Sequence, residues 1–358
     1  MRKKLAILLV LLMALPLVFV GCGNGNGDAP DAPAEEAAAD GELETIILYS
    51  NAISGGRGDW IVEHAREAGM DIQTVDAGGV DIANRLLAEA ANPQADVVFG
   101  LNQMLWFDLV AQDIFVPYVP AWADEVPSEL HEPNQYFHAV ALVVNLIAYD
   151  LDQIDPADAP TDWVDVWTNF EGRYALPNSL GGSTIQMHLA GILQRYLDED
   201  GTLGISDEGW RQIEMKFANG VPTDDDLFSE WVNPANDVAM SQIWHMGVAP
   251  REEDFGVRAG LVHPAIGVPV SVEGLAVVNG ANNPEGAQRF IDWFGSAEVM
   301  NAFALEFDYL PANPNAHDNL PEFTLEMAAM PSQPIDWVII SENMPSWVEH
   351  IYLNYLLR

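Results

Sequence analysis

Residues 45–49, Thr-Ile-Ile-Leu-Tyr, form a compact apolar segment that predicts a buried β-strand. Apolar residues then recur at helical spacing over 59–68, and the pattern stops at Gly69, a residue type that commonly ends helices. The alternation continues with strands expected at 70–75 and 96–99 and helices expected at 81–90 and 102–111. Strands that alternate with helices through short connections predict an α/β fold, in which a parallel sheet is covered by helices on both faces.

The carboxyl ends of these predicted strands carry polar residues. Tyr49, Ser50 and Asn51 end the first strand, and Asn102 follows the third. Ligands of open α/β sheets collect at the carboxyl ends of the strands. We therefore expect these four residues to contact a ligand, with ordinary packing as the alternative for each.

The start of the chain has the pattern of an export signal. Three positive charges at 2–4 precede an apolar run over 5–20, which as a helix is about 24 Å long, short of the roughly 30 Å hydrocarbon core of a membrane. Residues 1–21 therefore predict a secretory signal peptide. Cys22 directly follows Gly21 and resembles the cysteine of the bacterial lipoprotein lipobox, although Phe19 stands where leucine is usual. The resemblance implies lipidation of Cys22, and the alternative is an ordinary secreted protein.

The next segment has the composition of a linker. Residues 23–40 contain only Gly, Asn, Ala, Pro, Asp and Glu. Such a segment cannot bury enough surface to offset the entropy of ordering it. We expect residues 22–43 to be a flexible acidic tether that holds a globular body outside a membrane.

The chain is strongly acidic, with 54 Asp and Glu against 14 Lys and Arg and a formal net charge of −40. Without the three positive charges of residues 1–21 the charge is −43. This excess argues against nucleic-acid binding, because the phosphate backbone would be repelled. The acids are spread along the whole chain, which favours adaptation to high salt over attraction of a cationic ligand. Cys22 is the only cysteine, so the body has no disulfide and no thiol chemistry.

An ordered set of short segments resembles the solute-binding proteins of bacterial ABC importers, in the branch that handles ferric iron, thiamine, polyamines and aminoethylphosphonate. The segments are Leu-Tyr-Ser at 48–50, Ala-Asn-Pro-Gln-Ala-Asp-Val-Val-Phe-Gly at 91–100, Phe-Val-Pro-Tyr at 115–118, Trp-Val-Asp-Val-Trp at 163–167, Gly-Arg-Tyr-Ala-Leu-Pro at 172–177, Gly-Leu-Ala-Val-Val at 274–278, Asn-Pro-Glu-Gly-Ala at 283–287, Phe-Ile-Asp-Trp at 290–293 and Leu-Pro-Ala-Asn-Pro at 310–314. Each segment alone is weak, but the ordered set covers nearly the whole body.

The resemblance implies a type II periplasmic-binding-protein fold of class α/β. Such a fold has two lobes with mixed, mostly parallel sheets flanked by helices, and a cleft between the lobes. The β-rich runs 139–149 and 267–278 would be the two crossings between lobes, with buried core strand as the alternative. Lobe one would comprise residues 44–140 plus 275–358, and lobe two residues 141–274.

The resemblance also implies a function. The protein would be a monomeric, non-enzymatic receptor without a cofactor, anchored to the cell membrane through Cys22. It would deliver a small solute to an ABC permease and its ATPase. The sequence contains no Gly-x-Ser-x-Gly, His-Glu-x-x-His or P-loop signature. A secreted lipoprotein enzyme or sensor on the same scaffold is the alternative.

Gly182, Ser183 and Thr184 precede a helical pattern over 185–197. The free N–H groups and the dipole of a helix start favour an anion by about 0.3–1 kcal/mol. In ferric members of the family the matching loop holds the anion that accompanies the metal. The alternative is that Ser183 or Thr184 only caps the helix.

Two further candidates come from the matching positions of the family. Trp244 and His245 stand where ferric members carry adjacent tyrosines that ligate iron, and the missing tyrosines count against iron. We expect Trp244 to form an aromatic wall of the cleft, with ordinary packing as the alternative, and His245 to pack, with metal ligation as the alternative. Glu273 lies in the second crossing, where it would either meet a ligand ammonium group or remain a solvated charge.

These candidates together favour a small organic solute with both an anionic group and a positive charge. The helix start at 182–184 suits a phosphate-like or carboxylate group, while Glu273, Tyr49 and Trp244 suit an amine or a cationic ring. An aminophosphonate or a thiamine-like compound has this chemistry. Ferric iron held by a carboxylate- or anion-assisted site is the alternative.

Overall fold

The structure is a computed structural model that describes residues 44–356, so the predicted signal peptide, Cys22 and the predicted tether lie outside the described residues. The strands are β1 (Thr45–Ser50), β2 (Asp71–Asp76), β3 (Val97–Gly100), β4 (Phe115–Val116), β5 (His138–Asp150), β6 (Ala175–Pro177), β7 (Leu197–Thr202), β8 (Val221–Thr223), β9 (Met240–Trp244), β10 (Ala259–Leu261), β11 (Val270–Val278) and β12 (Leu310–Pro311). The α-helices are α1 (Arg57–Glu67), α2 (Gly79–Glu89), α3 (Gln103–Ala111), α4 (Trp163–Asn169), α5 (Ser183–Leu193), α6 (Asp207–Asn219), α7 (Val248–Phe255), α8 (Pro284–Phe294), α9 (Ala297–Phe307), α10 (Glu322–Ala329) and α11 (Trp337–Ile351).

One mixed sheet organises the body, with the strand order β10-β5-β11-β3-β1-β2. β1 pairs in parallel with β2 and β3, as the alternation of strands and helices predicted. The expectation of mostly parallel pairing is wrong for the described residues. β5 and β11 run in opposite directions and pair with each other antiparallel. Each also pairs antiparallel with all its other neighbours in the sheet.

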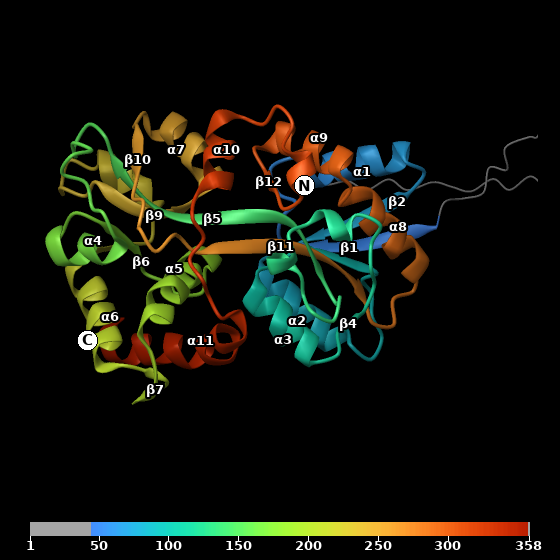
Figure 1. Cartoon of the computed structure of the whole chain (residues 1–358), viewed down its shortest axis with the longest axis horizontal. Helices are drawn as coiled ribbons and strands as arrows, with labels where there is room; N and C mark the ends of the chain where they lie inside the picture. Colours follow the sequence, from blue (N-terminus) through green and yellow to red (C-terminus); the bar gives the residue numbers. More distant parts are fainter. Residues whose placement is uncertain (1–43, 357–358) are drawn as a thin grey trace, which may run out of the picture. The chain divides into compact units, whose positions relative to one another are not determined.

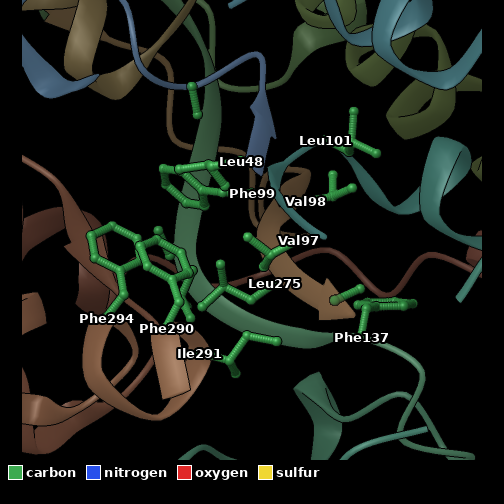
Figure 2. Close-up of a cluster of buried hydrophobic side chains, with 14 of the residues drawn as sticks. Leu48, Val97, Val98, Phe99, Leu101, Phe137, Leu275, Phe290, Ile291 and Phe294 are labelled. Atoms are coloured by element: carbon green, nitrogen blue, oxygen red, sulfur yellow. The ribbon is translucent and has the colours of Figure 1, made fainter. Parts of the chain in front are cut away.

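Buried apolar side chains form two clusters, which we call the first core and the second core. The first core gathers residues of β1, β3, β11, α8 and α9, and Figure 2 shows Leu48, Phe99 and Phe290 within it. The second core gathers residues of α4, α5, β9 and α11. Fully burying each large apolar side chain contributes about 1.5–3 kcal/mol, so each core is a substantial source of stability.

β5 and β11 connect these cores. They lie side by side across the middle of Figure 1 and pair over residues 138–144 of β5. Ala139 and Ala141 of β5 belong to the first core, whereas Leu146 and Ile147 belong to the second. We call this antiparallel pair the crossing strands; they coincide with the two runs in which crossings were expected.

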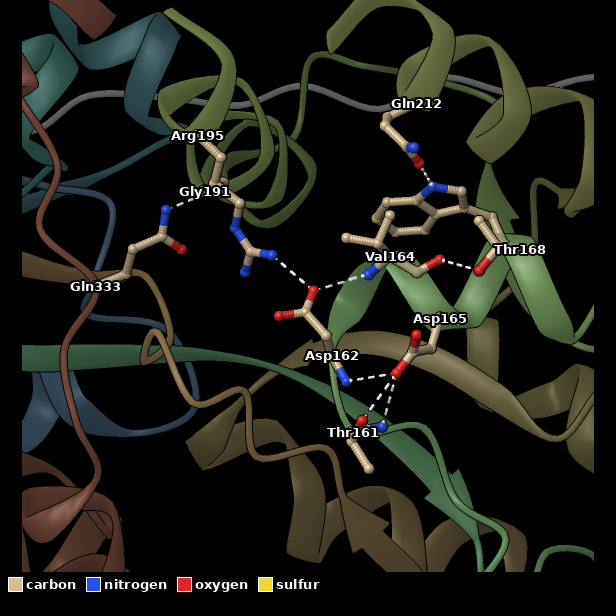
Figure 3. Close-up of polar contacts among 10 residues, drawn as sticks. Thr161, Asp162, Val164, Asp165, Thr168, Gly191, Arg195, Gln212 and Gln333 are labelled. Carbon is tan, nitrogen blue, oxygen red and sulfur yellow. Dashed lines mark hydrogen bonds and ion pairs between the residues drawn. The ribbon is translucent and has the colours of Figure 1, made fainter. Parts of the chain in front are cut away.

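The end of the chain differs from the expected lobe division, which placed all of 275–358 in lobe one. Ile340, Met344, Trp347 and Ile351 of α11 are buried in the second core. The chain returns there through residues 330–336, where Val268 N donates to Pro331 O at 2.9 Å and Gln333 N donates to Val268 O at 2.8 Å. Gln333 Nε2 also donates to Gly191 O at 2.7 Å (Figure 3). The helical spacing of the four apolar residues predicts a helix but does not say which core it joins.

Candidate functional site

A cavity of about 280 Å³ lies beside the crossing strands, and we call it the front cavity. It is lined by Asn51, Ala52, Ser54, Arg57, Leu101, Asn102, Val143, Asn145, Ser183, Thr184, Trp244, Met246, Ser271, Glu273 and Tyr309. Six residues singled out from the sequence therefore meet at one cavity, although they come from five separate stretches of the chain. These six are Asn51, Asn102, Ser183, Thr184, Trp244 and Glu273.

Three helices begin at the front cavity. Arg57 is the first residue of α1, Asn102 is the N-cap of α3, and Ser183 is the first residue of α5. The unpaired N–H groups and the dipole of each helix start favour a negative charge nearby. The three helix starts therefore favour an anionic group at this cavity, although the chain as a whole is strongly acidic.

Asn102 ties two of these helix starts together. Its Oδ1 accepts from Leu105 N at 3.2 Å, and its Nδ2 donates to Ser183 Oγ at 3.0 Å. Ser183 is not the N-cap of α5, since Gly182 occupies that position and makes no side-chain cap bond. The capping alternative for Ser183 and Thr184 is therefore wrong, and the Ser183 hydroxyl instead joins the segment before α3 to α5.

Asn51 fixes the turn that precedes Asn102. Its Oδ1 accepts from Leu101 N at 2.6 Å and so holds the turn between β3 and α3. Gly100 in this turn has a φ of 101°, and a Cβ there would lie 2.4 Å from Asn51 Oδ1. Only glycine fits both requirements, because other residues rarely adopt this φ and any side chain would displace Asn51.

Glu273 stands on the cavity face of β11, next to a register shift between Glu273 and Gly274. Its carboxyl is partly buried, and Oε2 is buried without a hydrogen-bond partner among the described residues. Burial raises the pKa of Glu273 to about 7, against smaller lowering effects of the Tyr309 hydroxyl and the Arg57 guanidinium. Near neutral pH this carboxyl can therefore either give a proton or hold one.

Arg57 and Tyr309 complete this corner, and neither was singled out from the sequence. The Arg57 guanidinium carbon lies 5.5 Å from the centre of the Tyr309 ring. The Tyr309 hydroxyl donates to Ala52 O at 3.3 Å, and burial, followed by the charge of Glu273, raises its pKa well above the usual value. The signals available were a lone arginine within Gly-Gly-Arg-Gly at 55–58 and a tyrosine directly before the Leu-Pro segment at 310.

Trp244 lies between the front cavity and an adjoining pocket of about 470 Å³. The two spaces share Ser183, Thr184 and Trp244 as wall residues. The Arg251 guanidinium carbon lies 4.8 Å from the centre of the Trp244 ring, and Arg251 also pairs with Asp226 at 2.8 Å. Gly182 lines this adjoining pocket rather than the front cavity, as do Asp224 and Asp225.

Tyr49 and Ser50 do not line the front cavity. Tyr49 is fully buried, and its hydroxyl donates to Glu89 Oε2 at 3.0 Å. Burial, and then Glu89, raises the pKa of Tyr49 to about 12. Ser50 is also fully buried, and its Oγ accepts from Ala52 N. Both side chains pack within the body, which agrees with the packing alternative and leaves them outside the lining through which a ligand contact was expected.

His245 does not line the front cavity either. Its Nδ1 accepts from Val144 N at 3.1 Å, and burial lowers its pKa to about 4. Among residues 44–356, no group of three or more His, Cys, Asp or Glu side chains is placed to hold a metal ion. Within the same residues, no helix combines the length and apolar character needed to span a membrane.

Two apolar cores joined by the crossing strands, with a polar cavity at three helix starts, have the arrangement of a binding protein that holds its ligand beside the strands between the cores. Residues 92–342 match the family of bacterial extracellular solute-binding proteins, and the chain belongs to this family. The chain is 34% identical over 313 residues to the probable ABC transporter periplasmic-binding protein y4fP of Sinorhizobium fredii. That match covers 87% of this chain and 86% of the relative.

Solved structures show the same fold. Iron-bound HitA from Pseudomonas aeruginosa has a TM-score of 0.71 at 18% identity, covering 86% of this chain and 99% of HitA. AfuA from Actinobacillus pleuropneumoniae, with exogenous fructose-6-phosphate bound, has a TM-score of 0.70 at 16% identity, covering 88% of this chain and 99% of AfuA. The predicted family and the type II periplasmic-binding fold are confirmed. The family implies an extracytoplasmic binding protein with a small-molecule ligand and an ABC permease as partner.

Proposed function

We propose that this protein captures a small organic solute with an anionic group in the front cavity and delivers it to an ABC import permease. The observation that carries the proposal is the position of Arg57 at a cavity where α1, α3 and α5 all begin. A guanidinium and free backbone N–H groups bind phosphate-like or carboxylate oxygens through charge-assisted hydrogen bonds. A sugar phosphate bound in AfuA is consistent with this chemistry on the same fold.

The remaining polar groups suit a second, positively charged group on the same solute. Glu273 has a buried oxygen without a hydrogen-bond partner in the described residues, and an ammonium group is a suitable donor to it. Asp224 and Asp225 add negative charge to the adjoining pocket. An aminophosphonate or a thiamine-like compound therefore remains the favoured ligand.

Ferric iron is the second candidate, because HitA is iron-bound and other solved structures of this fold are ferric-binding proteins. The front cavity offers Tyr309 and Glu273 as oxygen ligands for a hard cation. Two observations count against this candidate. Trp244 and His245 stand where ferric members of the family carry the two tyrosines that ligate iron, and the positive charge of Arg57 would repel a metal cation. Iron binding here would depend on an accompanying anion.

Calorimetry with aminoethylphosphonate, thiamine, spermidine and ferric citrate tests the proposal. We expect an anionic organic solute to bind and Arg57→Gln to weaken it at least about tenfold, as the loss of one charge-assisted contact implies. Arg66→Gln is the matched control, because Arg66 is an exposed residue of the same helix outside the cavity lining. Tight ferric binding with a visible charge-transfer band, and no response to the organic solutes, would overturn the proposal.

The membrane anchor is a separate part of the proposed function. We propose that a lipid on Cys22 holds the binding protein at the cell membrane, where the permease resides. The wild-type protein should fractionate with membranes when it is expressed with its signal, and Cys22→Ser should release it or leave it unprocessed. Identical fractionation and processing of the two proteins would contradict the lipid anchor.

A further inference from the structure

A second cavity, of about 500 Å³, lies on the other face of the crossing strands, and we call it the back cavity. Side chains alternate between the faces of a strand, and here the alternation separates two chemistries. The residues of the crossing strands that line the front cavity are Val143, Asn145, Ser271 and Glu273. Those that line the back cavity are Leu142, Val144, Val270 and Val272. An occupant of the back cavity thus contacts the same two strands as a solute in the front cavity.

The walls of the back cavity are mainly apolar. Phe107, Phe137 and Trp337 provide aromatic surface, and Met327 and Met330 provide flexible thioether side chains that adapt to the shape of a ligand. Its lining includes neither lysine nor arginine, and of its two carboxylates Glu129 is exposed to solvent, while Glu132 accepts from Asn134 N at 3.0 Å and from Tyr136 N at 2.8 Å. An anion would find no permanently positive side chain there and would be repelled by the net charge of −40. The chemistry therefore favours an uncharged, mainly apolar molecule.

Gln333 supplies a polar contact point in this lining. The side chain is 4% exposed, and its Nε2 is engaged by Gly191 O. Its Oε1 is buried and has no hydrogen-bond partner among the described residues, and Figure 3 shows this oxygen without a contact. A buried carbonyl oxygen without a donor is unfavourable, so a ligand with a hydrogen-bond donor gains by reaching it.

The back cavity is also linked to the front cavity through neighbouring residues of α3. Gln103 lines the back cavity, and its Oε1 accepts from Val272 N at 2.9 Å. Asn102, the preceding residue, lines the front cavity and donates to Ser183. We propose that the back cavity is a second ligand site, which takes an uncharged, mainly apolar small molecule with one hydrogen-bond donor directed at Gln333.

Fluorescence titration of the full chain with N-phenyl-1-naphthylamine tests this site. The dye is uncharged, carries a single N–H group and emits more strongly in apolar surroundings. Ala328 is an exposed residue of α10 that lines the back cavity, whereas its exposed neighbour Ala329 is outside the lining. We expect Ala328→Trp to weaken dye binding at least about tenfold by filling the cavity, and Ala329→Trp to leave it within about twofold.

Two additional measurements keep the test decisive. Ser332 is exposed and lines the back cavity from a different segment of the chain, so Ser332→Phe should also block the cavity. It should weaken dye binding as much as Ala328→Trp does. The N-methylated dye lacks the donor and should bind at least about threefold more weakly than the parent dye. Absence of saturable binding, or equal affinity for wild type, Ala328→Trp and Ser332→Phe, would overturn the site. Equal affinity of the two dyes would overturn the role of Gln333.

Discussion

The two cores differ in how they accommodate buried polar side chains. Beside the first core, the Asp96 carboxylate is 1% exposed and accepts from Ile47 N at 2.8 Å and from Asn283 N at 2.7 Å. In the second core Lys216 is 3% exposed, and its ammonium lies 5.1 Å from the centre of the Trp167 ring. The ion pairs found among the described residues do not include Lys216. Asp96 is therefore compensated by two hydrogen bonds, whereas the Lys216 ammonium lies near the rings of Trp167 and Tyr174 and takes part in none of these ion pairs.

The buried Asp96 carboxylate helps to define the fold, whereas the buried Lys216 ammonium lowers the free energy of unfolding. Asp96 joins β1 to the start of α8, so its bonds fix the relative position of two elements that are distant in sequence. Burial lowers the pKa of Lys216 to about 7, because no nearby anion compensates for the lost hydration. The stability of the second core should therefore depend on pH in a way that the Asp96 contacts do not explain.

The largest effect should come from breaking the paired group. Asp96→Ala leaves two partly buried backbone N–H groups, those of Ile47 and Asn283, without acceptors and should lower the free energy of unfolding by about 3–5 kcal/mol. Chemical denaturation measures this change. Asp254→Ala is the control, because Asp254 is exposed, and it should shift stability by less than about 0.5 kcal/mol. Equal effects of the two variants would mean that the Asp96 contacts do not stabilise the fold.

Removing the Lys216 ammonium should raise the free energy of unfolding at pH 7, the opposite of the effect of Asp96→Ala. In the wild type Lys216 releases its proton near pH 7 when folded but near pH 10.5 when unfolded. Between these values the unfolded state binds more protons, so stability rises with pH. Lys216→Met should be more stable than wild type at pH 7, and its advantage should shrink by about 3 kcal/mol as the pH rises to 10. A constant difference across this range would show that Lys216 is charged in the folded protein.

Glu273 should show the reverse pH dependence, because its pKa is raised from 4.5 to about 7. Between these values the folded state holds the extra proton, so its contribution to stability is lost as the pH rises. The free energy of unfolding of Glu273→Gln, relative to that of wild type, should therefore rise by about 2 kcal/mol between pH 5 and pH 8. This is less than the pKa shift alone implies, because the side chain is only partly buried. Parallel stability curves for the two proteins would place the titration of Glu273 outside this range.

The smallest effect concerns the hydrogen bond between Asn102, the N-cap of α3, and Ser183, the first residue of α5. Ser183→Ala removes the acceptor of Asn102 Nδ2 and should cost about 0.5–1.5 kcal/mol, the usual net worth of one hydrogen bond. Ser128→Ala removes a hydroxyl outside the front cavity and serves as the control. Thermal melts of both variants at one pH measure the difference, and indistinguishable melting temperatures would mean that solvent replaces the contact without cost.

Local sequence patterns predicted the strands and helices that bring most of the site together. The alternation from β1 to α3 is visible as periodicity, and it places Asn51 and Asn102 at strand ends. The family resemblance supplied Trp244 and Glu273, which no local pattern distinguishes from packing residues. The contribution of these residues to ligand binding stays a prediction.

The misplaced residues have physical reasons. Tyr49 and Ser50 belong to a strand whose side chains enter the body, and only Asn51 after the strand end reaches the cavity. Arg57 escaped notice because its position depends on Gly55 and Gly56, whose φ values of 67° and 86° turn the chain before α1. The antiparallel pairing of β5 and β11 and the packing of α11 in the second core both depend on contacts between distant segments. Hydrophobic periodicity does not encode such contacts.

The position of α11 also has a consequence for biosynthesis. The first core needs α8 and α9, and the second core needs Trp347 and Ile351 near the end of the chain. A nascent chain that emerges from its N-terminus therefore cannot complete the first core before α9 has emerged, or the second core before Ile351 has emerged. Native contacts that join such distant segments slow folding, because the intervening chain must be ordered before they form. Neither core can therefore form from its N-terminal segments alone, so these segments stay unfolded and accessible to an export system while the later segments are being made.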